Sequence, residues 1–269
     1  MIIERNNHLT EANSEYTFKI LSSGNASFGN EWSADIQSPP FTRIYYTISG
    51  EGEIKGEDQL TALHAGSICL IPSGYTYSCT CQDTMNHLFF HINLADRSGI
   101  DRLFGLGKVF SANCSPDHLD QILSLYASQN EVDHLFLKAI LQSDLFALLR
   151  QNITELPKAE YSACVKDALE FIHTATSATL TVSKVANHVN HSPDSLAHKF
   201  KNEVGTPIGK FIDGLVMLKA ENLLINSDLS IAQISNVLGF YDQFYFSRRF
   251  KERFSLSPQR YRKNYKRKI

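Results

Sequence analysis

The sequence predicts an α+β chain of more than one domain, with a β-rich first part, a short helical middle and an all-helical last part. Three observations lead to this prediction. Short alternating or apolar runs separated by Gly and Pro turns fill the first hundred residues. From residue 116 onward apolar residues recur at helical spacing. The length of 269 residues is that of about two domains.

Short strands are expected throughout the first part. Residues 43–48 alternate, so that Ile44, Tyr46 and Ile48 share one face and Arg43, Tyr45 and Thr47 share the other. Residues 67–71 and 87–94 are further short apolar runs, and glycines or Pro-Ser-Gly turns separate them. Strands this short, with turns this frequent, indicate a small sandwich or barrel.

Two amphipathic helices are expected in the middle, over residues 116–126 and 132–149. Ser115-Pro116 is a typical cap followed by Pro at the first helical position. The apolar faces of these helices exceed what a small barrel needs to cover itself, so we expect a homodimer through residues 116–152. The alternative is that the helices close the side of the barrel. Residues 151–160, broken by Pro157, read as a linker.

The last part contains a repeated unit. Residues 182–201 and 231–251 each combine a short helix, a tight turn and a second helix that ends in Phe-Lys. In the second copy Ser230 and Gln233 form a capping box, Gly239 supplies a positive φ at the turn, and Asp242 caps the next helix. Two helix-turn-helix units joined by a helix over residues 207–226 can occupy major-groove faces about 34 Å apart. An all-α packing repeat without a ligand is the alternative.

The second helix of the second copy carries side chains suited to nucleic acid. Phe246 and Phe250 lie four apart on its buried face, and Gln243, Ser247 and Arg248 fall on other faces. A helix face with Gln, Ser and Arg side chains can reach base edges in the major groove. An ordinary amphipathic surface helix would show a similar pattern.

The charge distribution supports the nucleic-acid interpretation. Residues 1–158 contain 10 basic and 18 acidic residues, whereas residues 159–269 contain 16 basic and 10 acidic ones. Ten of those sixteen basic residues lie at or after Arg248. An acidic first half joined to a basic second half is typical of a sensor attached to a nucleic-acid-binding domain.

The last part resembles the AraC/XylS family of bacterial transcription regulators over about residues 168–262. The matching positions are residues 180–186, Leu196, Phe200, Lys201, Gly205, Ala220, Leu223, Leu224, Ile231, Ile234, Leu238, Gly239, Phe240, Phe246, Ser247, Arg248, Phe250, Lys251, Ser257, Pro258, Tyr261 and Arg262. The resemblance implies a bipartite reader of double-stranded DNA and an activator that contacts RNA polymerase.

The resemblance also implies which side chains read DNA. They are Asp194, Ser195, His198 and Lys199 in the first unit, and Gln243, Phe244, Ser247 and Arg248 in the second. Three departures from the family pattern stand out. His198 takes a position where Arg is common, Asp194 would repel phosphate or accept from a cytosine amino group, and Phe244 replaces a common Ser.

The first part resembles the cupin-like sensor domain of sugar-responsive members, through residues 48–52, 63–74 and 87–92. Here we expect an effector pocket for a small neutral sugar, because His87, Phe89 and His91 share one strand face. The expected ligand-binding residues are Trp32, Tyr45, Tyr77, His87, Phe89 and His91. The resemblance further implies that a polar arm before Tyr16 folds over the ligand. No metal site is expected, because His87 and His91 lie about 13 Å apart along a strand.

These observations predict a one-component transcription regulator with a cupin-like β-barrel sensor in residues 1–108. A helical dimerisation segment and linker follow in residues 109–158, and a double helix-turn-helix domain in residues 159–269. We expect a cytoplasmic protein without a membrane span, cofactor or catalytic residues. One alternative is a constitutive DNA binder whose barrel only dimerises. The other is a cupin-type sugar-processing enzyme, although the sequence offers no metal cluster or nucleophile–base pair for it.

Overall fold

An antiparallel sheet makes up the first part of the computed structural model, which describes residues 16–29, 33–36, 39–95, 101–156, 161–254 and 256–266. The strands are β1 (Thr17–Phe28), β2 (Ala34–Ile36), β3 (Thr42–Lys55), β4 (Leu60–His64), β5 (Ser67–Ile71), β6 (Tyr77–Thr80), β7 (Met85–Ala95) and β8 (Phe110–Asn113). Their main order is β1-β7-β3-β5-β8, and β4 and β6 pair with the second half of β3. Because the path ends at β1 and β8, the sheet is an open, cupin-like barrel.

The alternation predicted for residues 43–48 is present in β3, and it produces two different faces. Tyr45 pairs with Phe89 of β7 and Cys69 of β5, while its neighbour Ile44 pairs with Phe90 and Leu70. Both faces are buried, because helices cover one of them and the interior of the barrel lies behind the other.

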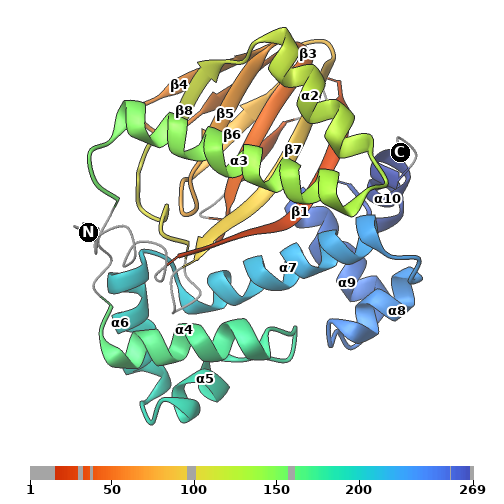
Figure 1. Ribbon diagram of the computed structural model, residues 1–269. Coiled ribbons are helices and arrows are strands. Elements are labelled where there is room, and N and C mark those ends of the chain that lie inside the picture. The colour runs from red at the N-terminus through yellow and green to blue at the C-terminus, as the bar shows by residue number, and fades with distance from the viewer. Residues whose placement is uncertain are drawn as a thin grey trace, which may run out of the picture.

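Two helices cover the first face of the sheet: α2 (Pro116–Ala127) and α3 (Glu131–Asn152) run across it in Figure 1. Asp144 of α3 fixes them to the sheet, since it accepts hydrogen bonds from Tyr46 Oη at 2.6 Å and from His118 Nε2 at 2.8 Å. Leu149 is only 3% exposed and belongs to this core, so it is not available on an outer face. The face left open on α3 contains Val132, Leu135, Phe136 and Phe146.

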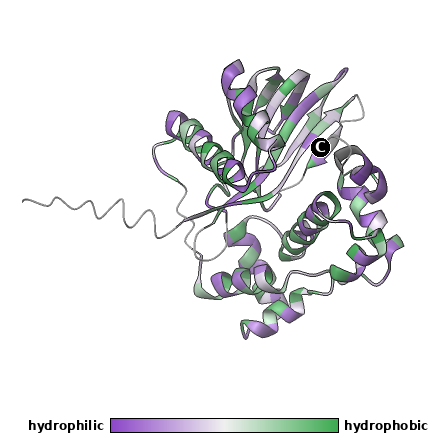
Figure 2. Cartoon of the chain, turned by 45° about the vertical axis from the view of Figure 1, so that its right-hand side comes forward, coloured by the Kyte–Doolittle hydropathy of each residue, from purple (hydrophilic) through white to green (hydrophobic). Residues whose placement is uncertain are grey.

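The last part is helical, as predicted. It consists of α4 (Ala163–Ala175), α5 (Val182–His188), α6 (Pro193–Val204), α7 (Ile208–Asn226), α8 (Ile231–Val237), α9 (Gln243–Phe254) and α10 (Pro258–Lys266). In Figure 1, α4–α6 and α8–α9 lie near opposite ends of α7, and α10 returns toward the sheet. Figure 2 shows hydrophobic residues along the inner sides of these helices and a largely hydrophilic α10.

The predicted repeat is present in detail. Asn190 and Gly239, which are 49 positions apart, both have positive φ, at 55° and 78°. In each copy the next amide closes the turn, with His191 N donating to the Ala186 carbonyl and Phe240 N to that of Ser235. The first copy therefore uses Asn where the second uses Gly, which is consistent with the tolerance of Asn for the left-handed region.

The helix caps also follow the prediction. Ser192 accepts from the Ser195 amide, Ser230 and Gln233 form the reciprocal capping box, and Asp242 accepts from the amides of Phe244 and Tyr245. Each cap satisfies amides that a helix start would leave without a partner. These bonds fix where α6, α8 and α9 begin.

The helix α7 packs against the sensor sheet as well as against the other helices, a contact that the sequence did not reveal. Gly214 approaches Pro40 so closely that a Cβ atom there would lie 2.8 Å from Pro40 Cδ. About two turns of helix further on, the Asn222 amide donates to the Leu21 carbonyl of β1. A single helix thus links the two helix-turn-helix units and forms part of the contact with the sensor.

The end of the sheet differs from the domain boundary expected from the sequence. Strand β8 pairs with β5, so the sheet continues past residue 108 to Asn113. Some of the predicted features lie outside the described residues. They are the linker residues 157–160, the arm before Tyr16, and Trp32.

No helix in the described part of the chain combines the length and apolar character that crossing a membrane requires.

Candidate DNA-binding surface and effector cavity

The second helix of each repeated unit, α6 and α9, presents a polar face to solvent. On α6, Asp194, Ser195 and His198 are exposed and Lys199 is half-buried. Leu196 and Phe200 form the opposite, buried face. The four sequence-predicted reading residues of the first unit therefore share one accessible side of the helix.

On α9 the exposed face is more aromatic than the sequence-based prediction assumed. Gln243, Phe244 and Arg248 are exposed, with Phe244 at 73%, and Ser247 is half-buried with its hydroxyl donating to the Gln243 carbonyl. Tyr241, at the turn, is 99% exposed, and the Arg248 guanidinium lies 5.8 Å from the centre of the Tyr245 ring.

The two consecutive arginines of α9 have different surroundings. Arg249 forms an ion pair with Asp213 of α7 and thereby fixes α9 to the linking helix. Arg248 points to solvent and has only the Tyr245 ring as a neighbour of note. Because position 248 corresponds to His198 in the repeat, the exposed face carries a guanidinium in α9 and an imidazole in α6.

Five of the six sequence-predicted effector residues line one cavity. Tyr45, Tyr77, His87, Phe89 and His91 are all buried and face a space of about 100 Å³. The rings of Tyr45 and His87 are stacked, with centroids 4.6 Å apart and an angle of 14° between the planes. Burial, and then the charge of His91, lowers the pKa of His87 to about 3, so its imidazole is neutral at physiological pH.

The other wall of this cavity comes from the helical domain, and sequence reasoning missed these residues. They are Glu221 of α7, Arg253 and Phe254 of α9, Leu256, and Tyr261 of α10. Arg43 of β3 also lines the cavity. A signal for Arg43 was present, because the alternation puts it on the same face as Tyr45.

A buried polar network crosses from the sheet to the helices at this cavity. The Glu221 carboxylate, 1% exposed, accepts from His91 Nδ1 at 2.9 Å and from the Tyr261 hydroxyl. Burial alone would raise the pKa of Glu221, but His91 and the two hydrogen bonds hold it below its usual value. Burial lowers the pKa of His91. The His91 imidazole and the Glu221 carboxylate thus share a buried hydrogen bond between the sheet and α7.

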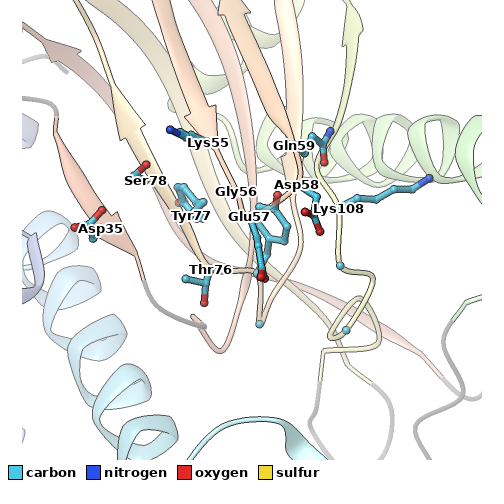
Figure 3. Close-up of a pocket in the computed structure, with 14 residues that line it drawn as sticks. Asp35, Lys55, Gly56, Glu57, Asp58, Gln59, Thr76, Tyr77, Ser78 and Lys108 are labelled. Carbon is cyan, nitrogen blue, oxygen red and sulfur yellow. The ribbon is translucent and has the colours of Figure 1, made fainter.

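A second, open cleft of about 810 Å³ lies beside the β3–β4 turn. Its side chains include Asp35, Lys55, Asp58 and Lys108, and Figure 3 shows Lys55 and Lys108 pointing away from each other. These charges of both signs do not converge on one point. The cavity lined by buried residues of the sheet and the helices is the better candidate, despite its smaller volume.

An open barrel joined to two helix-turn-helix units through a cavity-lining interface defines a ligand-responsive, DNA-binding transcription regulator. The comparisons agree: a family model for a helix-turn-helix domain matches residues 185–264. The helix-turn-helix region is thus of the AraC type, as the resemblance implied.

Three relatives align over most of their length. The chain is 26% identical to the Msm operon regulatory protein of Streptococcus mutans, covering 82% of this chain and 83% of that one. It is 27% identical to the arabinose operon regulatory protein of Escherichia coli, covering 83% and 80%. It is 24% identical to the raffinose operon transcriptional regulatory protein RafR of Pediococcus pentosaceus, covering 82% and 84%.

The fold of the whole chain is similar to that of ToxT from Vibrio cholerae, with a TM-score of 0.65 over 93% of this chain and 99% of that one. The two sequences are 14% identical, so this similarity concerns the fold alone.

Proposed function

We propose that the protein regulates transcription in response to a sugar that binds in the cavity between the sensor sheet and the helical domain. The observation that carries the proposal is that both domains line this one cavity. Three relatives named as regulators of the Msm, arabinose and raffinose operons support a sugar as the effector. The Tyr45–His87 stack provides an aromatic face for a ring's C–H groups and a polar atom for its hydroxyls.

The size of the cavity suggests how binding is coupled to DNA recognition. Small-molecule sites typically enclose about 300–1,000 Å³, and this space of about 100 Å³ is smaller than that. A sugar therefore requires the wall formed by Glu221 and Tyr261 to move away from β7. Occupancy then competes with the His91–Glu221 hydrogen bond, and the position of α7 changes.

On the DNA side we propose that α6 and α9 enter successive stretches of the major groove. The proposed reading residues are Asp194, Ser195, His198, Lys199, Gln243, Phe244, Ser247 and Arg248. The exposure of Tyr241 and Tyr245 adds aromatic contact surface beside Arg248.

We further propose that the active species is a cytoplasmic homodimer that activates transcription through contact with RNA polymerase. The partner surface is the open apolar face of α3, which contains Leu135 and Phe146. With β8 counted as part of the sheet, the sensor corresponds to residues 1–113, the dimerisation helices and linker to residues 114–158, and the DNA-binding domain to residues 159–269.

The proposal is tested with purified full-length protein and a duplex selected from a random library. Arabinose, xylose, lactose and raffinose are titrated while DNA affinity and melting temperature are followed. At least one sugar should change both. The fluorescence of Trp32, the only tryptophan of the chain, is a third readout.

Two outcomes would support the rival functions. A protein that binds its duplex with unchanged affinity whatever sugar is present is a constitutive DNA binder. Chemical conversion of a sugar, followed by chromatography, would instead indicate the cupin-type enzyme.

A further inference from the structure

Arg43 is a buried cation at the wall of this cavity. It lies in β3, is 4% exposed, and its guanidinium carbon is 4.6 Å from the centre of the Phe41 ring and 5.8 Å from that of Tyr77. Its Nη1 atom is buried and has no hydrogen-bond partner within the described part of the chain. Leaving a buried donor unsatisfied is costly, so such an atom at a cavity wall indicates a missing acceptor.

A second guanidinium lines the same cavity. Arg253 reaches it from α9, and burial together with the charge of Arg43 lowers the pKa of Arg253. Among the described residues, no carboxylate lies within ion-pair distance of either guanidinium.

The Glu221 carboxylate at the cavity already accepts hydrogen bonds from other side chains. Glu221 is the one carboxylate among its described lining residues, and both of its oxygens accept hydrogen bonds, from His91 and from Tyr261. With two guanidinium groups against one carboxylate, the cavity has an excess positive charge. Because Arg43 and Glu221 are buried, this charge favours an anion more strongly than it would in water.

We propose that Arg43 binds an anionic group of the effector, so that the effector is a sugar phosphate or a sugar acid rather than a neutral sugar. This inference rests on the proposed function, since it specifies the ligand of the same cavity. The guanidinium fork matches carboxylate and phosphate oxygens, and its position on a strand of the sheet keeps it in place when the helices move. Arg253 supplies a second contact from the DNA-binding domain, so the ligand itself joins the two domains.

The test compares neutral sugars with their charged counterparts on the full-length protein. Glucose, galactose and arabinose are titrated by calorimetry beside their phosphates and their uronic or aldonic acids, and inorganic phosphate is added as a separate probe. One charged sugar should bind about tenfold or more tightly than its neutral parent, as a charge-assisted hydrogen bond provides. Arg43→Gln should remove that advantage, and the exposed control Arg150→Gln should keep it.

The outcomes separate this inference from the proposed function. A neutral sugar that binds as tightly as its charged counterparts, in both the parent and Arg43→Gln, overturns the anion site and leaves the sugar sensor intact. Phosphate binding that depends on Arg43 without any sugar binding keeps the anion site and overturns the sugar effector. Absence of all binding overturns both. If circular dichroism shows that Arg43→Gln does not fold, the binding of neutral and charged sugars is compared in Arg253→Gln instead. Arg253 is partly exposed, so this change is better tolerated.

Discussion

The neutral, buried imidazole of His87 should make the protein lose stability as the pH falls. Its pKa is about 3 in the folded chain against the ordinary 6.5. Between these two values the unfolded chain binds one proton more than the folded chain, so acid favours unfolding. The contribution is absent above pH 6.5 and grows by about 1.4 kcal/mol for each pH unit below it. From pH 7 to pH 5 the loss attributable to His87 is roughly 2 kcal/mol.

The measurement is urea unfolding of the full-length protein, followed by circular dichroism at pH 7 and at pH 5. The quantity compared is the difference in unfolding free energy between the two pH values within one protein, so a general loss of stability in a variant cancels. His87→Gln should reduce this difference by roughly 2 kcal/mol. His64→Gln, a change at an exposed histidine, should leave it unchanged.

His91 has a lowered pKa for the same reason, burial, and its effect has the same sign. The His87→Gln protein should therefore keep part of its acid sensitivity. An equal pH 7-to-5 loss in His87→Gln and in the parent protein would refute the reasoning, because it would mean that His87 titrates alike in the folded and unfolded chains.

Three further predictions follow from the contacts. Arg248→Ala should weaken binding to a selected duplex by roughly 1–3 kcal/mol, with little loss on scrambled DNA, as judged by fluorescence anisotropy; equal losses on both would reduce Arg248 to a phosphate contact. Phe146→Glu should give a folded monomer in analytical ultracentrifugation, and a dimer in this protein would exclude α3 as the dimer interface. Leu149→Glu should instead unfold the sensor, since Leu149 is buried. Glu221→Gln should lower the unfolding free energy by about 1.5–3 kcal/mol in urea titrations, because it loses charge-assisted hydrogen bonds, and an unchanged value would show that this network contributes little.

The local features were predictable because they depend on neighbours in sequence. Caps at Ser230 and Asp242 and the turn at Gly239 follow from short-range hydrogen bonding and φ preferences, and the structure has each of them. The alternation in β3 likewise depended only on a period of two. The same reasoning placed His87, Phe89 and His91 on one strand face, and they line one cavity together with Tyr45 and Tyr77.

What depends on the contact between domains was not predictable from a single sequence. Glu221 lies three residues from Leu218 and from Leu224, which marks it as an acid on an apolar helix face. Helical spacing cannot tell that this face packs against β7 of another domain, nor that His91 would be its partner. The spacing of α3 could not show which of its sides is covered, because it supports an apolar stripe on both of them.

The position of α7 connects these features to DNA recognition. Its 19 residues span about 28 Å at 1.5 Å per residue, close to the 34 Å that separate major-groove faces of one DNA turn. Pro40, Leu21 and His91 of the sensor all contact this helix, at Gly214, Asn222 and Glu221. A ligand that displaces Glu221 from His91 therefore acts on the one element that sets the spacing of both units. We expect a small movement there to change the fit of α6 and α9 to DNA together, because neither unit can follow the sensor without the other.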